Sequence, residues 1–231
     1  MTTQAFFITG TDTAAGKTLV SEALLHAAAA KGLSTLGLKP VAAGTEIRDG
    51  VMVNEDAWLL QQAASLDVDY FRVNPVVLEQ AMAPHIAAVA EGVNINARQL
   101  ALQCCETLDV LQPDFAVIEG AGGWCVPLND DETMVDLCIG LARPVVLVVG
   151  MQLGCLNHAL LTAQAIKASG LILAGWVANR IDPDMQAFDE NVASLQARLP
   201  APLLGIVPAL EGADAARRAA DHLNIDLLMS R

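Results

Sequence analysis

A glycine-rich loop near the start of the chain carries residue types suited to binding phosphate. It reads Gly10-Thr11-Asp12-Thr13-Ala14-Ala15-Gly16-Lys17-Thr18, between an apolar stretch and an Ala/Leu-rich stretch of helical length. Backbone N–H groups of such a loop, with the N-terminus of the following helix, form a concave region of partial positive charge. We expect Lys17 to reach the β- and γ-phosphates of a nucleotide and the Thr18 hydroxyl to ligate Mg²⁺. Gly10 lies one residue further from Gly-Lys-Thr than in the usual pattern.

Two further charged residues come at the ends of apolar runs. Lys39 follows Thr35–Leu38 and precedes Pro40, whose ring favours an extended conformation for Lys39. Glu119 ends the run from Phe115 and is followed by glycines. Read alone, Lys39 could be a solvated lysine, and Glu119 could cap a helix or pair with an arginine. If both runs are parallel strands, both residues face one binding edge, where Lys39 adds a second cation and Glu119 holds Mg²⁺.

Asp56 has two interpretations that the residues alone do not separate. It lies in the first turn of a predicted helix that Asn54 would cap, and a helix dipole is enough to explain an acidic residue there. A carboxylate is also a hard oxygen ligand of the kind that Mg²⁺ prefers.

The pattern of apolar runs predicts an α/β fold of the doubly wound type, with a mainly parallel sheet and helices on both faces. Short β-branched runs alternate with Ala/Leu-rich stretches, as in sheets buried on both faces. The predicted strands are Ala5–Thr9, Thr35–Lys39, Phe115–Glu119, Val145–Val149, Leu173–Ala178 and Leu203–Val207. The predicted helices are Lys17–Ala30, Glu55–Ala64, Ala97–Leu111, Leu156–Ala168 and Met185–Leu199, several opened by a capping residue such as Asn54, Asn96 or Asp184. Residues 1–231 are predicted to form one domain, with an irregular excursion over the binding edge at Gly44–Gly92.

Composition argues against several classes of partner. The chain has 26 Asp and Glu residues against 13 Lys and Arg residues, a formal net charge of -13, so we expect no nucleic-acid partner. Five cysteines without CxxC spacing indicate neither a disulfide framework nor a structural metal site, which fits the cytoplasm. The start of the chain lacks the features of a signal peptide. The uncharged segment Pro144–Ile166 is long enough to span a bilayer but reads as a strand followed by a helix, so no membrane partner is expected.

Together these motifs closely resemble the dethiobiotin synthase family. The resemblance rests on Gly10–Thr18, Lys39–Gly44, Asn54–Asp56, Glu119–Trp124 and Leu153–Ala159, in the same order and spacing. Further matches at Gly175–Asn179 and Ala201–Gly205 extend it to about Leu210.

The resemblance implies a homodimeric P-loop ligase that uses ATP, Mg²⁺ and CO2 to convert 7,8-diaminononanoate to dethiobiotin in biotin biosynthesis. By the family pattern, Thr13, Lys17 and Lys39 surround the transferring phosphoryl group, while Thr18, Asp56 and Glu119 hold Mg²⁺. The implied nucleotide-binding residues are Thr13, Ala14, Ala15, Gly16, Lys17, Thr18, Asp56, Glu119, Asn179, Pro208, Ala209 and Leu210. The implied substrate walls are Ala43, Gly120, Ala121, Gly122 and Gly123 of one chain, with Leu153, Gly154 and Asn157 of the other.

Two positions depart from the family pattern. The family usually has Glu where this chain has Ala14, and Ser where it has Ala43. The missing hydroxyl at Ala43 removes an expected hydrogen bond worth about 1 kcal/mol. We therefore expect slower turnover or a different preferred substrate.

Two alternatives remain open from the sequence: a related synthase acting on another amine, and a regulatory ATPase resembling MinD and ParA. The second is weakened because this chain has no early P-loop lysine and no basic amphipathic helix at its end.

Overall fold

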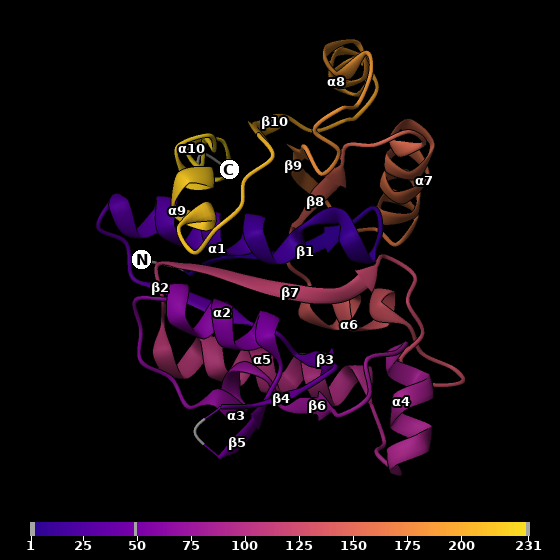
Figure 1. The fold of residues 1–231 in the computed structure, drawn as a ribbon. Helices are drawn as coiled ribbons and strands as arrows, with labels where there is room; N and C mark the ends of the chain where they lie inside the picture. The colour runs from indigo at the N-terminus through magenta and orange to yellow at the C-terminus, as the bar shows by residue number, and fades with distance from the viewer. Residues whose placement is uncertain (1–2, 49, 230–231) are drawn as a thin grey trace.

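A six-stranded parallel sheet forms the centre of the computed structural model, which describes residues 3–48 and 50–229 (Figure 1). The strand order is β10-β9-β8-β1-β7-β2, and every neighbouring pair is parallel. The strands are β1 (Gln4–Gly10), β2 (Thr35–Leu38), β7 (Phe115–Gly123), β8 (Val145–Gly150), β9 (Leu173–Asn179) and β10 (Leu203–Val207). All six predicted strands and the predicted fold class are confirmed. The predicted boundaries hold to within one residue, so that Lys39 lies just outside β2, with one larger error: β7 does not end at Glu119 but continues through the glycines to Gly123, which pairs with Gly10.

Helices cover both faces of this sheet, because successive strand residues point to opposite faces and the residues on both faces are apolar. Phe6 and Ile8 of β1 belong to the core beneath α1, α9 and α10, whereas Ala5 and Phe7 belong to the core on the other face (Figure 1). The first face carries α1 (Lys17–Ala30), α9 (Ala215–Ala220) and α10 (Asp226–Met229). The second carries α5 (Ala97–Leu111), α6 (Met134–Leu141), α7 (Cys155–Ala168) and α8 (Phe188–Gln196).

Most helix predictions hold to within a residue, with one exception. α1 and α5 have the predicted bounds, and Asn54 and Asn96 accept the capping hydrogen bonds expected of them. The prediction that Asp184 opens a helix at Met185 was wrong, because α8 begins only at Phe188. Asp182 instead forms a turn, in which its side chain accepts from the Asp184 N–H and its carbonyl accepts from the Met185 N–H.

The excursion between β2 and α5 is more regular than predicted. β3 (Val41–Ala43) pairs in parallel with β6 (Val76–Leu78), and β4 (Glu46–Arg48) forms an antiparallel hairpin with β5 (Val51–Val53). Its helices are α2 (Glu55–Ala63), α3 (Tyr70–Val73) and α4 (Pro84–Glu91). Elements of three or four residues show too little periodicity to be recognised in a sequence.

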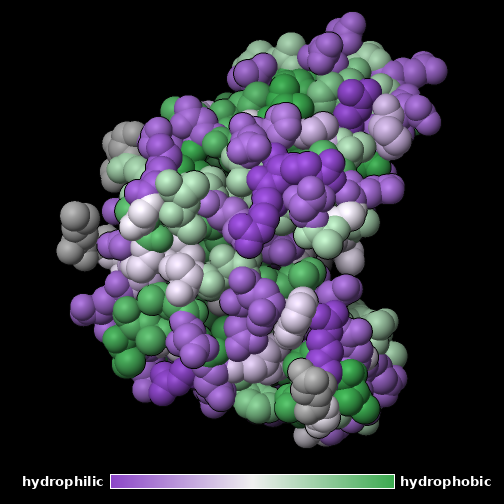
Figure 2. All heavy atoms as spheres, turned by 60° about the vertical axis from the view of Figure 1, so that its left-hand side comes forward, coloured by the Kyte–Doolittle hydropathy of each residue, from purple (hydrophilic) through white to green (hydrophobic). Residues whose placement is uncertain are grey.

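Within the part of the chain that the structure describes, every helix is too short or too polar to cross a bilayer. The uncharged segment Pro144–Ile166 forms β8 and most of α7, as predicted. On the face shown in Figure 2, hydrophilic residues are spread widely, with hydrophobic ones in smaller groups between them.

Glu22 couples the stability of this fold to pH. Burial and, to a lesser extent, Glu119, Asp56 and Glu55 raise the pKa of Glu22 from 4.5 to about 7. A raised carboxyl pKa means that stability is lost as pH rises through this window. We predict that Glu22→Gln stabilises the protein by on the order of 1 kcal/mol at about pH 8, after allowance for solvent screening, and not at about pH 4. Thermal unfolding at both pH values checks this, and equal shifts would contradict it.

Candidate active site

The phosphate-binding loop lies between β1 and α1 and is held to the sheet on one side. Thr13–Ala15 form a short 3₁₀ turn, capped by Asp12, whose side chain accepts from the Thr13 N–H at 2.7 Å. The Thr11 hydroxyl accepts from the Gly150 N–H of β8 at 3.2 Å. Gly16, with φ of +81°, turns the chain into α1. The loop is therefore fixed at the carboxyl edge of the sheet, as predicted for residues 10–18.

Lys17 lies almost buried inside this loop. Its ammonium donates to the carbonyls of Asp12 and Thr13, each at 3.2 Å. Burial, followed by the neighbouring Lys39, lowers the pKa of Lys17 to about 8. Carbonyl contacts do not neutralise the charge, so Lys17 remains available to an anionic ligand.

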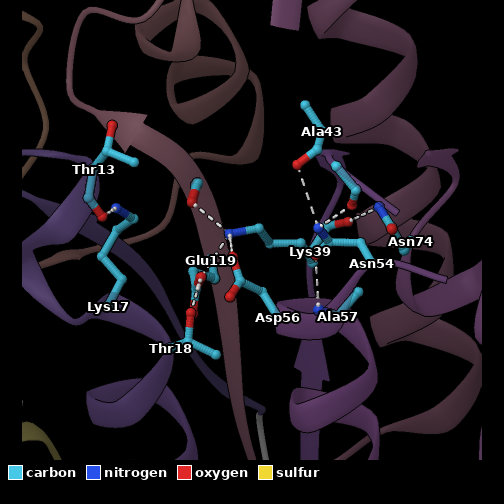
Figure 3. A network of polar contacts seen from close by, with 12 residues as sticks. Thr13, Lys17, Thr18, Lys39, Ala43, Asn54, Asp56, Ala57, Asn74 and Glu119 are labelled. Atoms are coloured by element: carbon cyan, nitrogen blue, oxygen red, sulfur yellow. Dashed lines mark hydrogen bonds and ion pairs between the residues drawn. The ribbon is translucent and has the colours of Figure 1, made fainter. Parts of the chain in front are cut away.

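Lys39 and Glu119 form a buried ion pair, which the half-exposed Asp56 joins from the solvent side (Figure 3). The Lys39 ammonium lies 2.6 Å from Glu119 Oε1 and 3.2 Å from Asp56 Oδ2, and it donates to the Gly120 carbonyl at 3.1 Å. Burial alone lowers the pKa of Lys39, but Glu119 and Asp56 outweigh it, and the pKa lies above its usual value. Conversely, burial raises the pKa of Asp56, but Lys39 and Thr18 outweigh it and keep the carboxylate ionised. The structure thus brings Lys39, Asp56 and Glu119 together.

The oxygen atoms beside this group suit a hard divalent cation. The Thr18 hydroxyl donates to Glu119 Oε1 at 3.0 Å, while Glu119 Oε2 is buried with no hydrogen-bond partner among the described residues. An uncompensated buried carboxylate oxygen is costly unless a ligand or ion satisfies it. No three His, Cys, Asp or Glu side chains of the described residues form a metal cluster. That agrees with the habit of Mg²⁺, which uses one or two carboxylates and takes its other ligands from phosphates and water.

A cavity of about 700 Å³ joins the loop to an apolar recess. The loop residues and the polar residues of its lining are Thr13, Ala14, Gly16, Lys17, Thr18, Lys39, Asn54 and Asp56. The remaining lining residues are small or apolar, and we call them the apolar recess: Ala42, Ala43, Ala81, Met82, Ala83, Pro84, Ala121, Gly122 and Val126. The excursion therefore does cover the binding edge, and the site can hold a charged group beside a short hydrocarbon chain. Sequence analysis missed Met82, Pro84 and Val126, because single apolar residues outside a periodic run carry no signal.

A second cavity of about 660 Å³ lies on the other side of the loop. Gly16, Asn179, Pro208, Ala209 and Leu210 line it. The last four, which by the family pattern would contact adenine, therefore lie together. The Asn179 amide donates to the Ala15 carbonyl at 2.9 Å, which ties this cavity to the phosphate loop.

The remaining implied residues are divided. Ala43, Ala121 and Gly122 line the first cavity, whereas Gly120 and Gly123 do not. Leu153 and Gly154, just before α7, and Asn157, in its first turn, are exposed and lie outside that cavity as well. Leu153 is 97% exposed. These three residues could serve as a substrate wall only for another molecule.

The fold and this loop together define a P-loop nucleotide-binding protein. A family model described as an AAA domain matches residues 4–217. The ATP-dependent dethiobiotin synthetase BioD of Cellvibrio japonicus is 56% identical over 229 residues, covering 99% of both chains. That of Aromatoleum aromaticum is 52% identical over 217 residues, covering 94% of this chain and 96% of its own. This chain belongs to the AAA-domain family and to the ATP-dependent dethiobiotin synthetase family.

Solved structures agree on the fold. MinD of Pyrococcus horikoshii with Mg-ADP has a TM-score of 0.54 at 18% identity, covering 98% of this chain and 90% of its own. Chloroplast FtsY of Physcomitrella patens has a TM-score of 0.57 at 18% identity, covering 96% of this chain and 65% of its own. Likeness at this identity concerns the fold alone, so it does not favour a MinD-like regulatory role.

Gly16 provides a test of the loop. A Cβ there would overlap Asn179 Nδ2, in a backbone conformation that costs other residues about 1–2 kcal/mol. We predict that Gly16→Ala weakens ATP binding about tenfold or more, measured by calorimetry. Gly32→Ala is the matched control, because φ is +80° there and nothing lies within 4 Å. Unchanged ATP affinity in Gly16→Ala would argue against this loop as the phosphate site.

Proposed function

We propose that this protein is an ATP-dependent cyclo-ligase that closes the cyclic urea of dethiobiotin from 7,8-diaminononanoate and CO2. The observation that carries the proposal is the Lys39 ammonium, buried between Glu119 and Asp56 in the cavity that the phosphate loop shares with an apolar recess. Family relatives of up to 56% identity are dethiobiotin synthetases, and the two alternative functions have no comparable support.

The chemistry proceeds in three steps on the substrates. One amine attacks CO2, and with loss of a proton the new C–N bond gives a carbamate. A carbamate oxygen attacks the γ-phosphorus of ATP, ADP leaves, and a carbamic-phosphoric anhydride forms. The second amine attacks the carbonyl carbon, and phosphate leaves as the ring closes and a proton is lost. No step needs a covalent bond to the protein.

The protein contributes position and charge to the phosphoryl transfer. We assign Lys17, Lys39 and Thr13 to the region of the transferring group, with the loop backbone at residues 13–16 holding the phosphates. Such preorganised donors cost little reorganisation during the reaction and supply most of the acceleration in phosphoryl transfer. The alkyl chain of the diamine fits the recess that contains Ala43 and Val126.

Charge balance supports a requirement for Mg²⁺. Lys17 and Lys39 carry two positive charges, and Asp56 and Glu119 carry two negative ones, so these four side chains leave the triphosphate uncompensated. Thr18, Asp56 and Glu119 would hold the ion, which when bound neutralises phosphate charge. Glu119 Oε2, which lacks a partner among the described residues, supports this assignment.

We further propose a homodimer, in which Leu153, Gly154 and Asn157 of one chain complete the substrate site of the other. Their exposure, and the partial positive charge that a helix N-terminus such as that of α7 carries, suit them to the carboxylate of the diamine. A cytoplasmic location remains a prediction from the cysteine pattern.

The proposal is tested by measuring phosphate release and dethiobiotin formation with ATP, Mg²⁺, bicarbonate and 7,8-diaminononanoate. Omission of any one component should abolish both products. Phosphate release that persists without the diamine would instead support a regulatory ATPase, and product from a different amine would support the related-synthase alternative.

Lys39 should be essential to turnover. We predict that Lys39→Gln, which keeps a hydrogen-bond donor beside Glu119, lowers kcat by on the order of a hundredfold or more. Lys167→Gln, at an exposed lysine of α7, is the control and should leave kcat unchanged. Near-normal kcat in Lys39→Gln would remove Lys39 from the mechanism.

A site shared between two chains can be detected by mixing inactive variants. We predict that Lys39→Gln and Asn157→Asp are each nearly inactive, the second because its carboxylate repels that of the diamine. A mixed dimer has one site with both native residues and one site with neither. Random subunit exchange makes about half of the dimers mixed, so roughly a quarter of all sites should regain activity. Activity equal to the sum of the two variants alone would contradict the shared site.

A further inference from the structure

We infer that a partly buried hydrogen-bonded chain through Asn74 and Tyr70 positions Lys39 relative to the start of α2, and so sets the positions of the Lys39 ammonium and of Asp56 in the site. The inference rests on the proposed function of Lys39. Neither Asn74 nor Tyr70 lines the cavity, so both act through other residues.

Asn74 holds the main chain of Lys39. Its side chain is fully buried, and its amide donates to the Lys39 carbonyl at 2.6 Å and to the Val76 carbonyl at 3.0 Å. The Lys39 N–H donates to the Val73 carbonyl at 2.8 Å. Lys39 lies just beyond the end of β2, so this 73–74 segment, and not the central sheet, fixes both of its backbone polar groups.

Tyr70 connects Asn74 to the start of α2. Its hydroxyl donates to Asn74 Oδ1 at 3.1 Å and accepts from the Asn54 N–H at 2.7 Å. Asn54 caps α2 by accepting from the Ala57 N–H at 3.2 Å, and its amide donates to the Gly44 carbonyl at 2.8 Å. Asp56 is the second residue of α2. The Tyr70 hydroxyl therefore fixes the position of the first turn of α2, which contains Asp56, relative to the main chain of Lys39.

Lys39 is held at both its main chain and its ammonium, so a shift of its main chain would change the position of the reacting cation. Figure 3 shows the main chain of Lys39 beside Asn54 and Asn74, and its ammonium reaching across to Glu119 and Asp56. Two sets of contacts therefore determine the position of the Lys39 ammonium: the carboxylates of Glu119 and Asp56 at the end of the side chain, and the hydrogen bonds of Asn74 at the main chain. A misplacement of about 1 Å in a reacting site can cost about a hundredfold in rate, so a small shift of either set of contacts is enough to slow turnover.

The experiment uses Tyr70→Phe, which keeps the ring and removes the hydroxyl, and Asn74→Asp, which keeps an acceptor for Tyr70 and removes the amide donor. We expect each to lower kcat about tenfold while KM for ATP stays within about twofold, because the loop is untouched. Ser34→Ala is the matched control. It removes the Ser34 hydrogen bonds to Asp114, at 2.7 and 2.9 Å, near the beginnings of β2 and β7. It should lower the melting temperature with kcat unchanged.

A double variant separates positioning from general stability. If Tyr70 acts through Lys39, Tyr70→Phe should change kcat less than about twofold in a Lys39→Gln background. The same tenfold loss in both backgrounds, or normal kcat in Tyr70→Phe, would overturn the inference. Dethiobiotin formation by the wild-type protein would still support the proposed function in that case. If the wild-type protein forms no dethiobiotin, the proposed function and this inference are both wrong.

Discussion

The buried contact between the Lys39 ammonium and Glu119 is the constraint on which the site depends. A buried charge must be paired, and breaking such a pair costs about 3–5 kcal/mol. Glu119 belongs to the inner strand β7, whereas Lys39 lies just after the edge strand β2, so the pair joins two neighbouring strands at the point where β2 ends. The pair holds in contact, within one site, a cation and the carboxylate that we propose as a ligand of Mg²⁺.

The parallel sheet makes this meeting possible. Its strands all end at one edge, and the phosphate loop after β1, Lys39 after β2 and Glu119 in β7 lie there side by side although they are far apart in sequence. The excursion after β3 then covers this edge with Asp56 and with apolar residues such as Met82. The parallel sheet, a fold found in many nucleotide-binding proteins, provides the loop proposed to bind phosphate. The excursion after β3 provides most of the apolar residues that would receive an alkyl chain.

The sequence predicted the six central strands because strands buried on both faces are nearly unbroken apolar runs. It predicted Lys17 from the glycine-rich loop, and Lys39 and Glu119 from their places at the ends of such runs. It missed α6 although Thr133 and Asp136 form a capping box, and α4 although Pro84 begins it and Gly92 ends it. The link through Asn74 could not be predicted, because a buried asparagine shows its partners only once distant segments are folded together.

The Asn179 amide, which reaches from β9 to the carbonyl of Ala15 and lies close to Gly16, links the second cavity to the phosphate loop. The two halves of a nucleotide therefore do not meet independent surfaces. A group bound in the second cavity that shifted Asn179 would also shift the Ala15 carbonyl of the loop, so binding on one side would change affinity on the other, and the reverse by the same factor.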